Sequence, residues 1–139
     1  MGDAPQAPVV SLNVGGLIGF LLGMVVGQLA LGVAVGVPGF AALAIASQIG
    51  ASAAVAMALA GMLGAVLCAA IGVAFGRRRE LDWWFLAGAA FPLPALALIL
   101  LRGLLSGGDA FGAIALGAYV VANVSLIAGF WLGRRRRSA

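Results

Sequence analysis

Three polar side chains, Gln28, Tyr119 and Asn123, lie inside long, mostly apolar stretches. Their amide and hydroxyl groups donate and accept hydrogen bonds, but none carries a charge at neutral pH. When the apolar stretches are set side by side, the three residues fall within about one helical turn of each other. We therefore expect one interhelical hydrogen-bond cluster. Its simplest role is to hold helices together, and the alternative is a polar lining for a small permeating solute.

Residues that catalyse reactions or bind metals are scarce in this chain. It has no histidine, Cys68 is its only cysteine, and no Asp, Glu, Lys or Arg falls within the apolar stretches. Catalysis needs a nucleophile with a base, or a metal site. We expect no enzyme activity, no cofactor and no metal. The missing carboxylate also argues against the rotary-ring proteolipids and small multidrug exporters, which need an acidic residue inside the membrane.

The apolar stretches themselves indicate a membrane protein. The chain is 64% hydrophobic and 9% charged, and it carries no charge between Asp3 and Arg77. Such a run is stable only in the hydrocarbon core of a bilayer. The fold class we predict is an all-α membrane protein, a compact glycine-rich bundle of four transmembrane helices. The predicted spans are residues 12–35, 51–75, 83–101 and 111–132.

Other segments complete the predicted organisation. Residues 1–11 hold no basic residue and read as a disordered tail rather than a signal peptide. Residues 12–133 form the membrane domain and residues 134–139 a basic tail. Pro38 and Gly39 are expected to end the first span, leaving residues 40–48 as a short stretch at the outer surface. Pro92 and Pro94 are expected to kink the third span.

Two arginine clusters predict the orientation of the chain. Arg77, Arg78 and Arg79 follow the second span, and Arg134, Arg135, Arg136 and Arg137 follow the fourth. Basic residues next to spans stay in the cytoplasm, so both termini are expected there. The clusters also attract anionic lipid head groups, whereas nucleic acid is not an expected partner. The absence of lysine, with abundant Ala and Gly, suggests a high-GC bacterial genome, and we therefore expect the spans to lie in a bacterial inner membrane.

Small residues recur at helical spacing on three of the predicted spans. Such stripes let helix backbones approach closely in a membrane. They predict either tight packing within the bundle or faces left for other subunits. The residues concerned are Gly15, Gly19, Gly23 and Gly27 in the first span, Gly64 and Gly72 in the second, and Gly129 in the fourth.

These features favour a non-catalytic accessory subunit that packs against a larger inner-membrane complex. The alternative is a homo-oligomeric channel or facilitator for a small uncharged solute, built around Gln28, Tyr119 and Asn123. A phage-type hole-forming protein ranks third, because four spans are more than such proteins usually need. The expected partners are membrane lipids and either other membrane subunits or further copies of this chain.

Overall fold

The computed structural model describes Gly2 and residues 14–139 of this chain. The described part is helical, without strands, and four of its helical segments are long and apolar enough to cross a membrane. The predicted tail of residues 1–11 lies outside the described residues, apart from Gly2. In chain order the helices are α1 (Val14–Ile49), α2 (Ala53–Arg77), α3 (Trp83–Ala90), α4 (Leu93–Leu105) and α5 (Ala110–Ser138).

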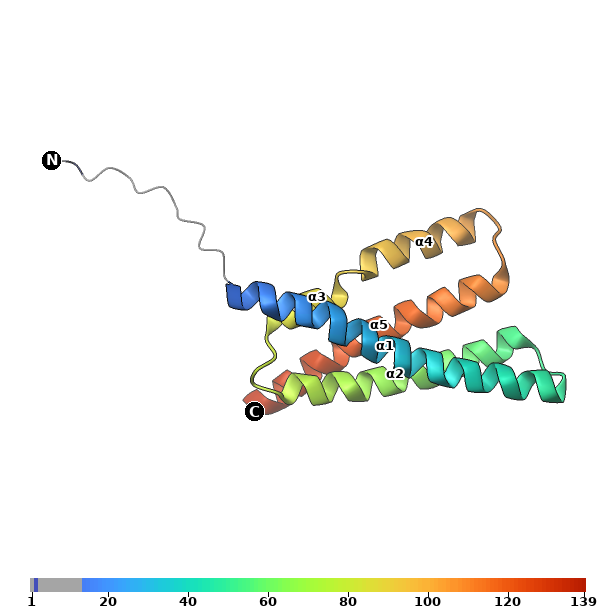
Figure 1. The fold of residues 1–139 in the computed structure, drawn as a ribbon, viewed down its shortest axis with the longest axis horizontal. Helices are drawn as coiled ribbons and strands as arrows, with labels where there is room; N and C mark the ends of the chain where they lie inside the picture. The colour runs from blue at the N-terminus through green and yellow to red at the C-terminus, as the bar shows by residue number, and fades with distance from the viewer. Residues whose placement is uncertain (1, 3–13) are drawn as a thin grey trace.

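Helix α1 is longer than the sequence predicted. It continues through Pro38 to Ile49, so the expected break at Pro38 and Gly39 is absent (Figure 1). Gly39 is buried against the side chain of Met57 in α2, so the C-terminal part of α1 packs on the bundle instead of lying along a membrane surface. Proline is tolerated inside membrane helices where neighbouring groups compensate the lost hydrogen bond.

The third span is divided where the sequence placed a kink. Helix α3 ends at Ala90, Phe91 and Pro92 form a turn, and α4 begins at Leu93. Pro92 lacks the N–H that a continuous helix would need, and Pro94 lies in the first turn of α4, where proline is well accommodated. Figure 1 shows α4 directed away from α1, whereas α3 lies beside it.

Two aspartates begin helices. The carboxylate of Asp82 accepts hydrogen bonds from the backbone N–H groups of Trp84 and Phe85, at 3.0 and 3.2 Å. Asp109 accepts from the N–H of Gly112 at 3.1 Å. Both satisfy amides that have no partner within the helix. At the other end of α5, residues 134–138 continue the helix rather than forming a separate tail.

Helices α2 and α5 run in the same direction and interlock through glycine. A side chain on Gly72 would overlap the carbonyl oxygen of Leu126 in α5, and one on Gly129 would overlap the carbonyl oxygen of Ala69 in α2. The two backbones therefore meet without intervening side chains. This reciprocal contact is typical of paired GxxxG helices in membranes.

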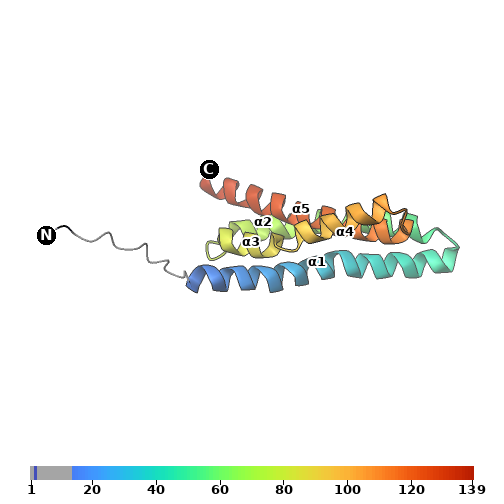
Figure 2. The same ribbon diagram turned by 90° about the horizontal axis from the view of Figure 1, so that it is seen from above.

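Helices α1 and α3 make a second parallel contact of the same kind. Gly23 of α1 faces the carbonyl oxygen of Phe85, and Gly88 of α3 faces the carbonyl oxygen of Phe20. A Cβ atom at either glycine would overlap the opposing oxygen. Figures 1 and 2 both show α3 alongside the first half of α1.

The two reciprocal contacts reveal an internal repeat. The paired positions differ by a constant 65 residues in α1 and α3 (20 and 85, 23 and 88), and by 57 in α2 and α5 (69 and 126, 72 and 129). The sequences agree at these places: residues 20–23 (FLLG) match 85–88 (FLAG), and 72–79 (GVAFGRRR) match 129–136 (GFWLGRRR). The chain thus pairs two related helical hairpins with approximate two-fold symmetry.

The bundle is packed most closely toward the end where the arginine clusters lie. Phe85, Leu86 and Phe130 form one buried cluster there, with the rings of Phe85 and Phe130 stacked at 6.3 Å. A second cluster includes Leu31, Cys68 and Leu126. Toward the opposite end, the α1–α2 hairpin and the α4–α5 hairpin separate (Figure 1), and none of the α4 residues is buried.

Candidate functional site

Gln28 and Tyr119 meet inside the bundle. The Tyr119 hydroxyl donates a hydrogen bond to Oε1 of Gln28. Nε2 of Gln28 in turn donates to the backbone carbonyl oxygen of Ala89 at 3.2 Å. One amide side chain therefore joins α5, α1 and α3, three segments far apart in the sequence.

The carbonyl oxygen of Ala89 is free to accept from Gln28 because of the break between α3 and α4. Ala89 lies in the last turn of α3, where carbonyl groups lack their usual helical donors. An unsatisfied carbonyl is costly in a membrane, and Gln28 provides the missing donor. The polar groups of Gln28 and Tyr119 are thus hydrogen-bonded to each other and to the backbone, as expected of residues that hold helices together.

Asn123 does not join this cluster. Its side chain is 0% exposed, and neither its amide nitrogen nor its amide oxygen has a hydrogen-bond partner. Cys68, also 0% exposed, belongs to the adjacent apolar core as a free thiol. The expected three-residue cluster therefore contains two of its members, and the third is a buried amide without a partner.

The glycine stripe of α1 follows a different line from the predicted one. Gly23 and Gly27 are buried against α3 and Gly19 is half-buried, but Gly15 is exposed. Gly16 is buried instead, beneath the indole of Trp84. A four-residue period drifts around the helix by about 40° per step, whereas seven residues return almost to the same face. Gly16 therefore shares the face of Gly23.

In the other helices the predicted small residues lie at contacts. A Cβ atom on Gly64 would lie 2.9 Å from the carbonyl oxygen of Ala34 in α1. Gly72 and Gly129 form the reciprocal contact of α2 with α5. The sequence did not single out Gly88, the equivalent of Gly23 in α3, whose signal is the repeated FLxG segment.

The arginine-rich end contains a site that the sequence did not predict as a unit. Nη1 of Arg134 donates to the carbonyl oxygen of Leu81 at 3.1 Å, and its guanidinium lies 5.3 Å from the centre of the Trp83 ring. The guanidinium of Arg135 lies 3.6 Å above the Trp131 ring. Both are cation–π distances. These four side chains and Ser138 line a cavity of about 290 Å³, which we call the Trp–Arg cavity.

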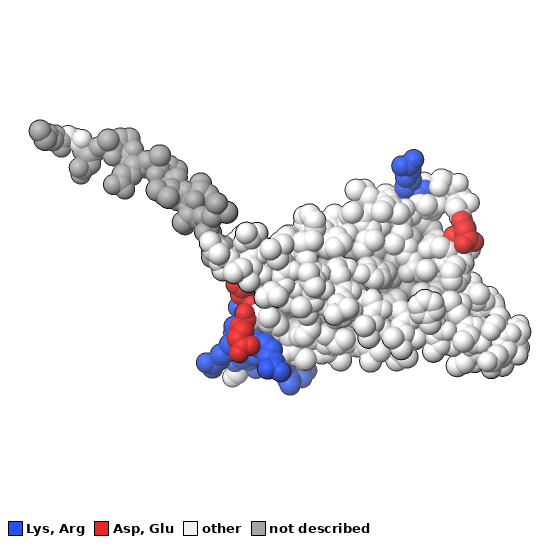
Figure 3. All heavy atoms as spheres, viewed as in Figure 1, with Lys and Arg blue, Asp and Glu red and all other residues white. Residues whose placement is uncertain are grey.

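The remaining arginines of the two clusters have a simpler setting. Figure 3 shows most of the basic side chains gathered at one end of the molecule. Arg102, in the last turn of α4, and Asp109, at the start of α5, belong to the other end. Both arginine clusters therefore share one end. Their remaining members are all exposed: Arg77, Arg78, Arg79, Arg136 and Arg137.

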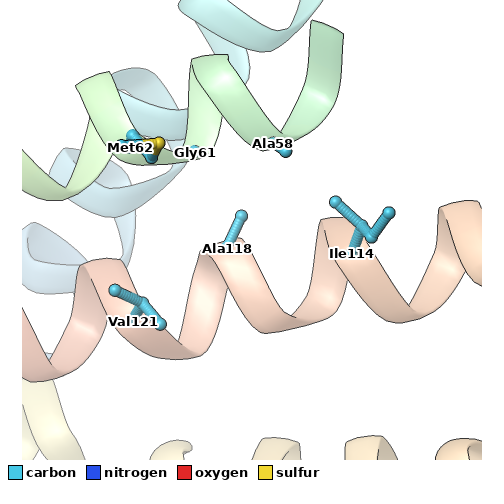
Figure 4. Close-up of a pocket in the computed structure, with 6 residues that line it drawn as sticks. All are labelled: Ala58, Gly61, Met62, Ile114, Ala118 and Val121. Carbon is cyan, nitrogen blue, oxygen red and sulfur yellow. The ribbon is translucent and has the colours of Figure 1, made fainter. Parts of the chain in front are cut away.

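A cavity of about 220 Å³ lies between the diverging halves of α2 and α5. Figure 4 shows its walls, with Ala58, Gly61 and Met62 on α2 facing Ile114, Ala118 and Val121 on α5. Every one of these lining residues is apolar or glycine, so the cavity offers space for an apolar chain and no group for chemistry. Within the described part of the chain, no three Cys, Asp or Glu residues cluster as a metal site would require.

The fold and these sites define a multi-pass helical membrane protein, with four segments able to span a bilayer. Comparison with protein-family models, with curated proteins and with solved structures finds no match to this chain.

Proposed function

We propose that this protein is a non-catalytic integral membrane subunit that packs against a larger complex in a bacterial inner membrane. Its role is to complete the helix packing of that complex and its seal against lipid. The interior supports this role, because Gln28 and Tyr119 bond to each other and to the backbone between helices rather than forming a nucleophile with a base.

The observation that carries the proposal is an unused glycine pair on α1. Gly32 and Gly36 have the GxxxG spacing, yet apart from the adjacent backbone of α1 itself no atom lies within 4 Å of a Cβ position at either residue. Elsewhere in α1 the buried glycines pack against α2 or α3. Leu29 and Val33 beside the open pair are 66% and 56% exposed. The pair therefore provides a surface on which another membrane helix can pack closely.

The proposed orientation follows from charge. Both arginine clusters lie at one end of the bundle (Figure 3), and basic residues flanking spans are retained in the cytoplasm. Trp83, Trp84 and Trp131 belong to the same end, at the depth where indole rings favour the membrane interface. We therefore place both termini in the cytoplasm.

The proposal is tested by isolating the protein from its native membrane. A C-terminal tag at native expression, mild solubilisation and native electrophoresis with mass spectrometry identify what migrates with it. We expect defined larger subunits to co-migrate, and we expect Gly32→Ile with Gly36→Ile to release them. Gly103→Ile with Gly117→Ile is the matched control, because these glycines are also open but lie on α4 and α5.

The contrary result is equally clear. A stable small oligomer of this chain alone, unchanged by the α1 variant, would overturn the accessory role. It would direct attention to the alternative of a homo-oligomeric channel. Protection of the buried Cys68 from a thiol-reactive dye verifies that each variant is folded.

A further inference from the structure

The internal repeat allows the residues of the Trp–Arg cavity to be compared with their equivalents in the first hairpin. Arg134 and Arg135 correspond to Arg77 and Arg78, 57 residues earlier in the chain (77 and 134, 78 and 135). Trp131 corresponds by the same offset to Ala74. The first hairpin thus carries equivalent arginines without the ring beneath the second of them. Positive charge beside a span serves topology in both hairpins, whereas the stacking of arginines on tryptophan rings distinguishes the second hairpin.

The two arginines of the cavity are held in place. Arg134 is fixed by its bond to the Leu81 carbonyl and by the Trp83 ring, and Arg135 is stacked on Trp131. A guanidinium has five N–H donors, of which the Leu81 bond uses one. The hydrogen bond and the two ring contacts restrict these side chains, and further N–H donors remain on each guanidinium. Held in this way, arginine is suited to binding phosphate through two parallel hydrogen bonds.

The charge of the residues around the cavity favours the binding of an anion. Among the described residues that line it, none is Asp or Glu. Asp82 is close in sequence to Trp83, but its carboxylate accepts the Trp84 and Phe85 amides at the start of α3. Ser138 donates its hydroxyl to the Arg134 carbonyl at 3.2 Å, within the last turn of α5. The charge facing the cavity is therefore positive and unneutralised by its lining.

We propose that the Trp–Arg cavity binds the phosphodiester of an anionic phospholipid. Its ligand chemistry is a phosphate, and its position indicates a lipid as the source. Trp83 and Trp131 are 53% and 42% exposed, and indole rings of this kind lie at the level of lipid head groups. Val124 lies about two turns from Trp131 toward the bilayer centre on the same face of α5, and it is exposed for contact with an acyl chain.

The proposal is tested with the full chain in an uncharged detergent, titrated with short-chain phosphatidylglycerol and monitored by native mass spectrometry. We expect Arg134→Gln with Arg135→Gln to bind about tenfold more weakly than the wild type, as for lost hydrogen bonds to a charged group. Arg77→Gln with Arg78→Gln is the matched control, because it removes the same charge from the equivalent place. Equal weakening by both pairs would show a diffuse polybasic attraction and overturn the site.

A charge-preserving pair separates geometry from charge. Arg134→Lys with Arg135→Lys keeps the net charge but loses the planar, stacked donors. We expect this pair to lose most of the selectivity for phosphatidylglycerol over phosphatidylcholine. Retention of wild-type affinity would overturn the proposal, and Cys68 protection from the thiol dye again reports folding.

A last arm distinguishes the two sources of phosphate. Inorganic phosphate and glycerol 3-phosphate are added at millimolar concentration to the lipid-loaded protein. We expect little displacement, because neither compound contributes apolar contact with the tryptophans. Displacement of the lipid by these ions at concentrations comparable to its own would assign the cavity to a soluble phosphate and overturn the lipid assignment.

Discussion

Asn123 is a buried polar residue in an unfavourable environment. Its amide is completely buried and has no hydrogen-bond partner, which costs free energy of about 1–3 kcal/mol by the usual measure for a buried polar group. We expect Asn123→Val to raise the thermal stability, because valine is of similar size and has no polar group to desolvate. The measurement is thermal unfolding in detergent, followed by reaction of Cys68 with a thiol-reactive dye.

Tyr119 provides the contrasting variant on the same helix. Its hydroxyl is bonded to Gln28, and hydrogen bonds between membrane helices average about 0.6 kcal/mol. Tyr119→Phe should therefore lower the stability by about that amount. If Asn123→Val destabilises the protein more than Tyr119→Phe does, the Asn123 amide forms a stabilising hydrogen bond in the folded protein and the prediction is wrong.

Comparing these residues also shows how much of the site could be predicted from the sequence. Depth along the membrane follows from counting residues, and counting placed Gln28 and Tyr119 at one level. Which way each side chain faces depends on the rotation of its helix. Neither hydropathy nor spacing fixes that rotation in a helix that is apolar on all sides. Asn123 lies at the same depth as Gln28 and Tyr119, but its side chain does not bond to either of them.

At the scale of the helices, glycine contacts determine stability according to what they face. We expect Gly72→Ala to destabilise the fold by about 1–3 kcal/mol, because its methyl group would overlap a backbone carbonyl in α5 that cannot rotate away. Gly117→Ala is the control in the partner helix, where nothing beyond the adjacent backbone of α5 lies within 4 Å of the added carbon. It should be neutral or slightly stabilising, since alanine favours helix.

Thermal unfolding followed by dye labelling of Cys68 measures both glycine variants. Similar losses at the two positions would mean that glycine acts through helix propensity rather than through close approach. The stripe of α1 shows why the structure was needed here. The sequence displayed an unbroken GxxxG series, but helical drift takes Gly15 off the contact and brings Gly16 onto it.

The break between α3 and α4 should be coupled to Gln28. Replacing both Pro92 and Pro94 with alanine permits one continuous helix, in which the Ala89 carbonyl accepts from the Leu93 N–H. We expect Gln28→Leu to cost less in that background than in the wild type, because the carbonyl no longer depends on the side chain. A double-mutant cycle of unfolding free energies measures the coupling, and strictly additive costs would contradict it.

The prolines also show that residue type alone does not predict where a helix ends. Pro92 lies where α3 gives way to α4, whereas Pro38 lies within continuous α1. The same residue type has opposite outcomes because membrane helices accept proline wherever tertiary contacts support the surrounding turns. The sequence indicated where helices were weakened, and packing decided which of them were interrupted.

For the molecule as a whole, the number of membrane-spanning segments followed from sequence because it depends on length and charge alone. The pairing of those segments did not, because most residues in both hairpins are interchangeable apolar types. The repeat is visible in the sequence only as FLLG and FLAG, and as the two GxxxGRRR ends. Reciprocal backbone contacts at constant offsets are what make the correspondence recognisable.

The repeat leads to a prediction about the intact bundle. Both glycine contacts join one hairpin to the other, so the halves should associate without a covalent link. We expect residues 1–79 and 80–139, expressed as separate chains, to assemble into the same bundle, since the cut falls in the exposed turn after Arg79. Co-purification of the untagged half with the tagged one measures the association.

Introducing Gly72→Ile into the first half is the control, because it blocks the contact with Leu126 and should abolish capture of the second half. Gly32→Ile in the same half leaves both contacts untouched and should preserve capture. Failure of the unmodified halves to associate would show that the covalent connection through the turn is needed to hold the hairpins together. Association that survives Gly72→Ile would show that contacts other than the glycine interlock hold the hairpins together.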